Sequence, residues 1–220
     1  MSDFLALKFL HIVGLAYWLG GDLGVFYSSY IVANRDASPA VRVSAAKTLF
    51  ALDQAPRVCM TMMLPLGVHL AWKLGVMPFD STVMMLVWVI AFAWLASVVF
   101  LHSGKNATLK ALLTKIDYVF RLSVIAVLIG AGVAALALDL WPAPYWVALK
   151  MIIFGVMMSM GLIIRVLLKD FGPAFAGLIG GAPTDADNDA IDRSLGRTRP
   201  FVLSIWAGLL LSTALGIHLL

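Results

Sequence analysis

The stretch KFLHIVGLAYWLGG, residues 8–21, decides the fold of this chain. It lies inside an apolar segment, Phe4–Val32, that is long enough to cross about 30 Å of hydrocarbon as a helix. His11, Trp18 and Gly21 recur within it at helical spacing, which predicts that they share one face. An ionisable side chain is costly in such a helix unless it has a partner, so His11 is the first candidate functional residue.

The composition places most of the chain in a lipid bilayer. Of 220 residues, 62% are hydrophobic and only 13% are charged, whereas soluble domains average about 25% charged residues. The single cysteine, Cys59, excludes an internal disulfide and any cysteine-based zinc or iron–sulfur centre. The bilayer is therefore the expected partner, and no nucleic-acid partner is expected.

Repeated apolar segments predict an all-α fold, a single integral membrane domain over residues 1–220. Six segments are long enough to span: Phe4–Val32, Val58–Val76, Thr82–Leu101, Val119–Leu138, Tyr145–Leu168 and Pro200–Leu220. An even number places both termini on one side. Residues 33–56 between the first two spans read as an amphipathic helix, and residues 170–199 as a mobile loop whose acidic run, 185–192, begins a helix.

The basic residues predict the orientation. Only Lys8, Lys73 and Lys150 fall on the side of the termini, and the other 13 of the 16 lysines and arginines fall on the opposite side. The positive-inside rule makes that opposite side cytoplasmic and both termini periplasmic. The expected location is the bacterial inner membrane.

Two histidines are predicted to lie at similar depth near the periplasmic face. His11 enters the first span from that side, and His69 lies six residues before the end of the second, with Lys8 and Lys73 one turn outward. Two imidazoles can ligate a b-type haem axially, while lysines pair with its propionates. Gly14 and Trp18 are expected to line the ring, and Lys150 enters from the same side. In the alternative, the histidines only bridge helices while the lysines reach the interface.

Soft ligands suggest copper as another cofactor. Cys59, Met60 and Met63 open the second span, and His102 ends the third span on the same side. Sulfur and imidazole together suit Cu(I), although methionine in an apolar helix is more often a core residue.

Asp22 is the carboxylate that the pattern places deep in a span. It is expected either to pair with Arg121 or Arg165 or to carry protons.

The motifs Lys8-x2-His11-x6-Trp18-x2-Gly21 and Trp146-x3-Lys150 resemble helix starts in the HemJ-type bacterial membrane protoporphyrinogen oxidases. The region Arg121–Lys169 and the Arg199-Pro200 start of the last span resemble the same family, and the copper-resistance CopD-like proteins are a broader relative. The resemblance implies a haem-associated His11 and a functionally required Lys150.

Together these patterns predict a haem-b membrane redox protein that transfers electrons or oxidises a quinol or porphyrinogen, in exchange with a partner redox protein. The alternatives are a CopD-like copper transporter and a non-catalytic membrane anchor, and homo-oligomerisation is left open.

Overall fold

The computed structural model describes residues 2–137 and 144–219, and every regular element in these ranges is a helix. The helices are α1 (Ser2–Ala33), α2 (Pro39–Leu52), α3 (Gln54–Lys73), α4 (Ser81–Ser103), α5 (Ala107–Ala137), α6 (Tyr145–Leu167), α7 (Phe171–Ile179) and α8 (Asp185–Gly216). The prediction of an all-α fold is confirmed.

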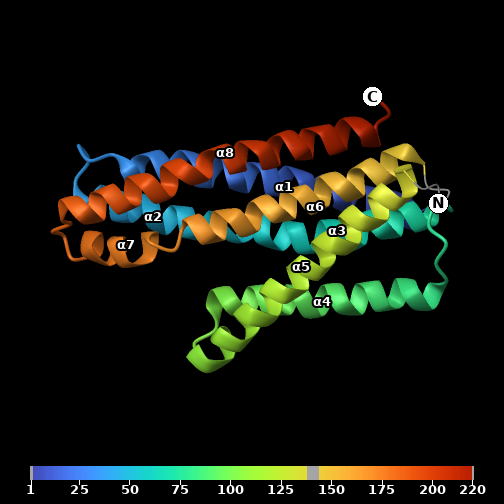
Figure 1. The fold of residues 1–220 in the computed structure, drawn as a ribbon, viewed down its shortest axis with the longest axis horizontal. Coiled ribbons are helices and arrows are strands. Elements are labelled where there is room, and N and C mark those ends of the chain that lie inside the picture. Colours follow the sequence, from blue (N-terminus) through green and yellow to red (C-terminus); the bar gives the residue numbers. More distant parts are fainter. Residues whose placement is uncertain (1, 138–143, 220) are drawn as a thin grey trace.

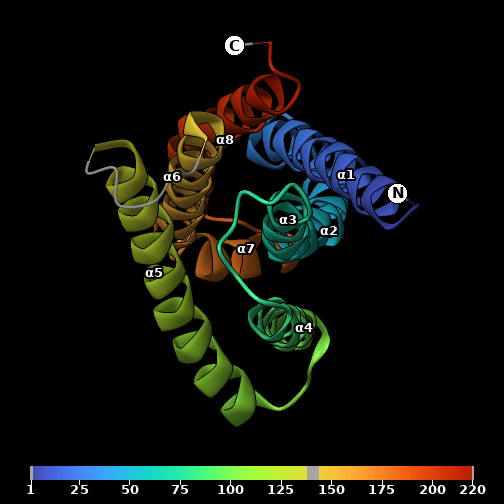
Figure 2. The ribbon, with the colours of Figure 1, turned by 90° about the vertical axis from the view of Figure 1, so that its right-hand side faces the viewer.

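Four long helices, α1, α3, α6 and α8, run side by side, and α2 leads into α3 so that the two together return along α1 (Figure 1). Both termini lie at one end of this bundle, and the short α7 lies at the other. Helices α4 and α5 stand on its outside, where α4 contacts α3 and α5 packs along α6 (Figure 2).

Five of these helices, α1, α4, α5, α6 and α8, are long and apolar enough to cross a membrane. Large apolar side chains are exposed on their outer faces, among them Phe9, Val89 and Val127. Such surfaces suit lipid, and a helix satisfies its own backbone hydrogen bonds there. The structure thus supports a multi-pass membrane protein.

The segment Val58–Val76 of the six predicted spans falls in α3, which is helical but is not one of these five. Gln54, Arg57, His69 and Lys73 make α3 more polar than its neighbours. Of the other five, the span predicted from Val119 begins much earlier, at Ala107, and Leu138 lies outside the described residues.

The loop predicted over residues 170–199 is wrong, because α7 and the start of α8 occupy most of it. The acidic run does begin a helix, as predicted: Thr184 caps α8, its hydroxyl accepting from the Asp187 N–H while the Asp187 carboxylate accepts from Thr184. Pro200 lies inside α8, so the polar start and the apolar span form one helix.

The helix predicted in residues 33–56 is confirmed as α2, which Ser38 caps. Its apolar side chains do not all gather on one buried face as predicted, because Arg42 is buried there while Val41 and Phe50 are exposed. The buried Arg42 fastens it, donating from Nε to the Val32 carbonyl and from Nη1 to Asn188 Oδ1 of α8, each at 2.8 Å. At the surface, Arg35 pairs with Asp189 and Asp192. Helix α2 and the start of α8 are thus held together at the end away from the termini.

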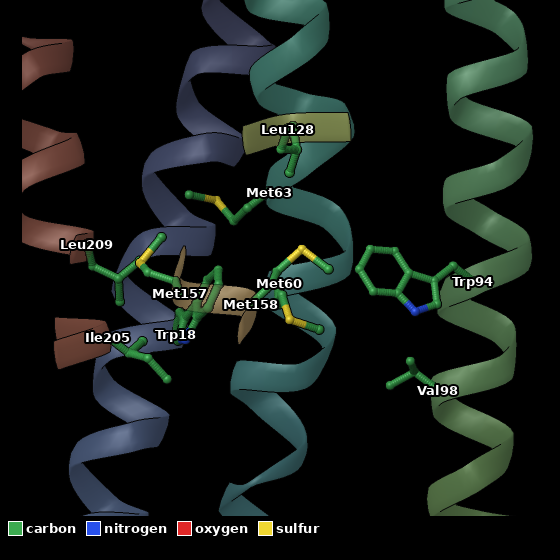
Figure 3. Packing of buried hydrophobic residues seen from close by; sticks show 10 residues of the cluster. All are labelled: Trp18, Met60, Met63, Trp94, Val98, Leu128, Met157, Met158, Ile205 and Leu209. Carbon is green, nitrogen blue, oxygen red and sulfur yellow. The ribbon is translucent and has the colours of Figure 1, made fainter. Parts of the chain in front are cut away.

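The central core is rich in sulfur (Figure 3). Its buried members are Trp18, Met60, Met63, Trp94, Val98, Leu128, Met157, Met158, Ile205 and Leu209. Trp94 and Val98 of α4 point toward the methionines, so α4 is attached to the bundle through this cluster. Unbranched methionine side chains fill irregular gaps between helices, which is the core role weighed for Met60 and Met63.

Candidate functional site

His11 lies where α1 packs on α3. A Cβ placed on Gly67 of α3 would lie 3.5 Å from His11 Cε1, so the imidazole rests against a helix surface without a side chain. His11 Nδ1 is buried and has no hydrogen-bond partner. A buried polar atom without a partner is uncommon and needs an explanation, and a role in ligand binding is one.

Lys150 of α6 lies within electrostatic range of His11. Its ammonium is 5.4 Å from the centre of the Trp146 ring and lies against Gly216 of α8, where a side chain would collide with it. The edge of Trp146 also meets the ring of His218, 5.6 Å between centroids. We call His11, Trp146, Lys150 and His218 the terminal-end cluster.

The cluster joins two residues that the sequence selected separately, His11 and Lys150. It also includes His218, whose ring contacts that of Trp146. Its position two residues from the C-terminus, on the same side as His11, was the only signal of this placement in the sequence.

His69 points elsewhere. Gly67 faces α1, and two residues further along a helix is a rotation of about 200°, so His69 faces away from α1. Its Nδ1 accepts a hydrogen bond from Trp88 Nε1 of α4 at 3.0 Å, and the Trp72 and Trp88 rings flank it. A neutral imidazole whose Nδ1 accepts carries its proton on Nε2, which then has no lone pair for a metal.

The described residues therefore do not present the predicted bis-histidine pair, because His69 is hydrogen-bonded to Trp88 whereas His11 has an unpartnered buried nitrogen. Of the other predicted haem contacts, two are exposed lysines and two lie in the packing between helices. Lys73 is exposed and lies over the Trp72 ring, 5.2 Å from its centre, and Lys8 is exposed on α1. Gly14 is in contact with Met63, and Trp18 is a core residue packed edge-on against Phe154. Gly14 and Trp18 thus serve helix packing.

The predicted copper ligands are not brought together. Met60 Sδ lies 3.2 Å from Arg121 Nη1, a cation. Cys59 and Met63 line an apolar groove between α1, α3 and α4, whereas His102 lines a separate cavity beside α5. Within residues 2–137 and 144–219, no three His, Cys, Asp or Glu side chains are grouped as a metal site.

The predicted pairing of Asp22 with Arg121 or Arg165 is wrong. Both arginines pair with Asp117 of α5, a fully buried carboxylate that also accepts from Trp94 Nε1. Asp117 precedes Arg121 by one helical turn, a spacing that could have revealed it. Asp22 lies beside the indoles of Trp18 and Trp206, about 16 Å along α1 from His11. Trp206 Nε1 is buried and makes no hydrogen bond of good geometry.

Comparison of the chain with protein-family models, with curated proteins and with solved structures finds no match. The functional argument therefore depends on the site itself.

Proposed function

We propose that this chain is a membrane oxidoreductase that binds one b-type haem through His11 of the terminal-end cluster. The observation that carries the proposal is the buried, unpartnered Nδ1 of His11. When bound, haem supplies one-electron redox chemistry.

His11 is held in place for this role because its ring packs against α3 at Gly67, where no side chain displaces it. The helix around it is apolar, which keeps water from the site. Because His69 is hydrogen-bonded to Trp88, α3 offers no second imidazole ligand beside His11. Single-histidine ligation favours oxidase chemistry over simple electron transfer, because it leaves a position on the metal open.

Lys150 supplies the positive charge of the site. Its ammonium lies over Trp146 in the first turns of α6, and α6 begins at the bundle end that holds both termini (Figure 1). At that position it would attract a carboxylate, whether a haem propionate or a carboxylate of a porphyrinogen substrate. A tetrapyrrole substrate or a quinol that enters from the bilayer would reach the cluster along the apolar outer faces of α1 and α8.

The test is a reduced-minus-oxidised visible spectrum of the full-length protein, purified in detergent from haem-replete cells. A b-type α-band is expected in the wild-type protein and in His69→Ala, and its loss is expected in His11→Ala. Lys150→Met is expected to keep folded protein but to retain less haem.

His102→Ala is the matched control, because His102 is exposed at the end of α4, away from the terminal-end cluster. A featureless wild-type spectrum, or haem loss in His69→Ala equal to that in His11→Ala, would overturn the proposal.

A further inference from the structure

A second cavity of about 460 Å³ lies between α3, α4, α5 and α6, at the end of α4 and the start of α5. The end of α4 and the start of α5 lie away from both termini (Figure 1). The terminal-end cluster contributes nothing to the lining of this cavity. Its charged lining residues are Asp53, Arg57, Lys110, Arg121 and Arg165, beside His102.

Cations are in excess in this cavity. Asp53 pairs with Arg57, and Asp117 behind the wall pairs with Arg121 and Arg165. Three cationic side chains thus share two carboxylates, and Lys110 is a fourth cation. Lys110, within the part of the chain that the structure describes, has no carboxylate at ion-pair distance. The lining, with Asp117 counted, therefore carries about two more positive than negative charges, and a bound anion would neutralise this excess.

The cations approach from three helices: Arg57 from α3, Lys110 and Arg121 from α5, and Arg165 from α6. One guanidinium is enough to satisfy both oxygens of a carboxylate, whereas a phosphate group presents oxygens in several directions and accepts from several cations. Arg121 is 6% exposed and is held in place by Asp117, so the wall of the cavity is pre-formed.

Two further features of the cavity wall indicate what else the ligand carries. Gln54 Oε1 lines the cavity, is buried and has no hydrogen-bond partner, so a ligand hydroxyl could donate to it. Phe50, Val98 and Leu101 form an apolar part of the wall. The volume exceeds that of a bare phosphate and falls in the ordinary range of small-molecule sites.

We propose that this cavity binds a phosphate-bearing anion through Arg57, Lys110, Arg121 and Arg165. The phosphate belongs either to the headgroup of an anionic phospholipid or to a soluble phosphate compound. Basic pockets between membrane helices commonly receive lipid headgroups. The excess of basic residues at this end of the bundle predicts that the cavity faces the cytoplasmic leaflet.

The experiment measures binding to the full-length protein in neutral detergent by native mass spectrometry and thermal shift. The probes are inorganic phosphate, short-chain phosphatidylglycerol and, as the zwitterionic control, phosphatidylcholine of the same chain length. Lys110→Ala is the test variant, because it removes a cation that pairs with no described carboxylate. Lys115→Ala, on the exposed surface of the same helix and outside the cavity, is the matched control.

Lys110→Ala is expected to weaken phosphate-dependent binding about tenfold, and Lys115→Ala to leave it unchanged. Preference for phosphatidylglycerol over inorganic phosphate identifies a lipid headgroup, and the reverse identifies a soluble anion. The proposal is overturned if neither phosphate probe binds, if phosphatidylcholine binds equally well, or if both lysine variants bind like the wild type. The haem spectrum is not involved, so this outcome is independent of the proposed oxidoreductase.

Discussion

Trp88 Nε1 of α4 donates a hydrogen bond to His69 Nδ1 of α3 at 3.0 Å. This one contact fixes the tautomer of His69 and turns its ring toward α4. A histidine that the sequence offers as a haem ligand is thereby assigned to helix packing.

The Trp88–His69 bond is expected to show as a coupling in a double-mutant cycle. Trp88→Phe and His69→Ala should each lower the free energy of unfolding, and the double variant should lose about 1 kcal/mol less than their sum. Thermal unfolding in detergent measures the four proteins. Strict additivity would mean that the bond contributes nothing.

Replacing Asp117 is expected to lower the free energy of unfolding more than replacing any other charged residue. Asp117→Ala would leave Arg121, whose side chain is 7% exposed, without its counter-charge, at a cost of about 3–5 kcal/mol. Asp53→Ala is the comparison, because its pair with Arg57 is partly exposed and should contribute less than about 1 kcal/mol. Chemical unfolding followed by tryptophan fluorescence checks both, and equal losses would contradict the assignment.

Gly132 and Gly130 of α5 allow a matched test of how closely α5 packs on α6, because only Gly132 of the two faces α6. A Cβ on Gly132 would lie 2.8 Å from the Ala148 carbonyl oxygen, whereas one on Gly130 would meet nothing within 4 Å. Gly132→Ala should therefore destabilise by about 1–3 kcal/mol, and Gly130→Ala should stabilise by roughly 0.5–1 kcal/mol. The midpoint of thermal unfolding should move in opposite directions for the two variants.

Membrane topology tests the role of α3. If α3 crosses together with the five apolar helices, reporters fused at the two termini should both respond as periplasmic, in agreement with the ends lying together in Figure 1. A reporter inserted between Asp36 and Ser38, at the start of α2, should respond as cytoplasmic. Opposite locations for the two termini would remove α3 from the spanning set.

Much of the architecture could be predicted because apolar length is a local property. The spans at Thr82–Leu101 and Tyr145–Leu168 agree with α4 and α6 within one or two residues. Residues 170–199 were misjudged because glycine, proline and aspartate are typical of loops, yet Thr184 caps a helix that continues through Pro200. The sequence marks α3 as a span by its apolar run, but Gln54, Arg57, His69 and Lys73 lower its hydropathy and keep it out of the five apolar helices. Membrane topology therefore decides whether α3 crosses.

The sequence by itself determined a helical membrane protein, the separation of its basic residues, and His11 and Lys150 as residues of interest. Those features follow from composition and spacing along a single helix. Only the tertiary structure decided which residues meet: His11 packs against Gly67, His69 bonds to Trp88, and both Arg121 and Arg165 pair with Asp117. Helical spacing fixes the relative directions of side chains on one helix, but the rotation and depth of neighbouring helices depend on how all their surfaces pack at once.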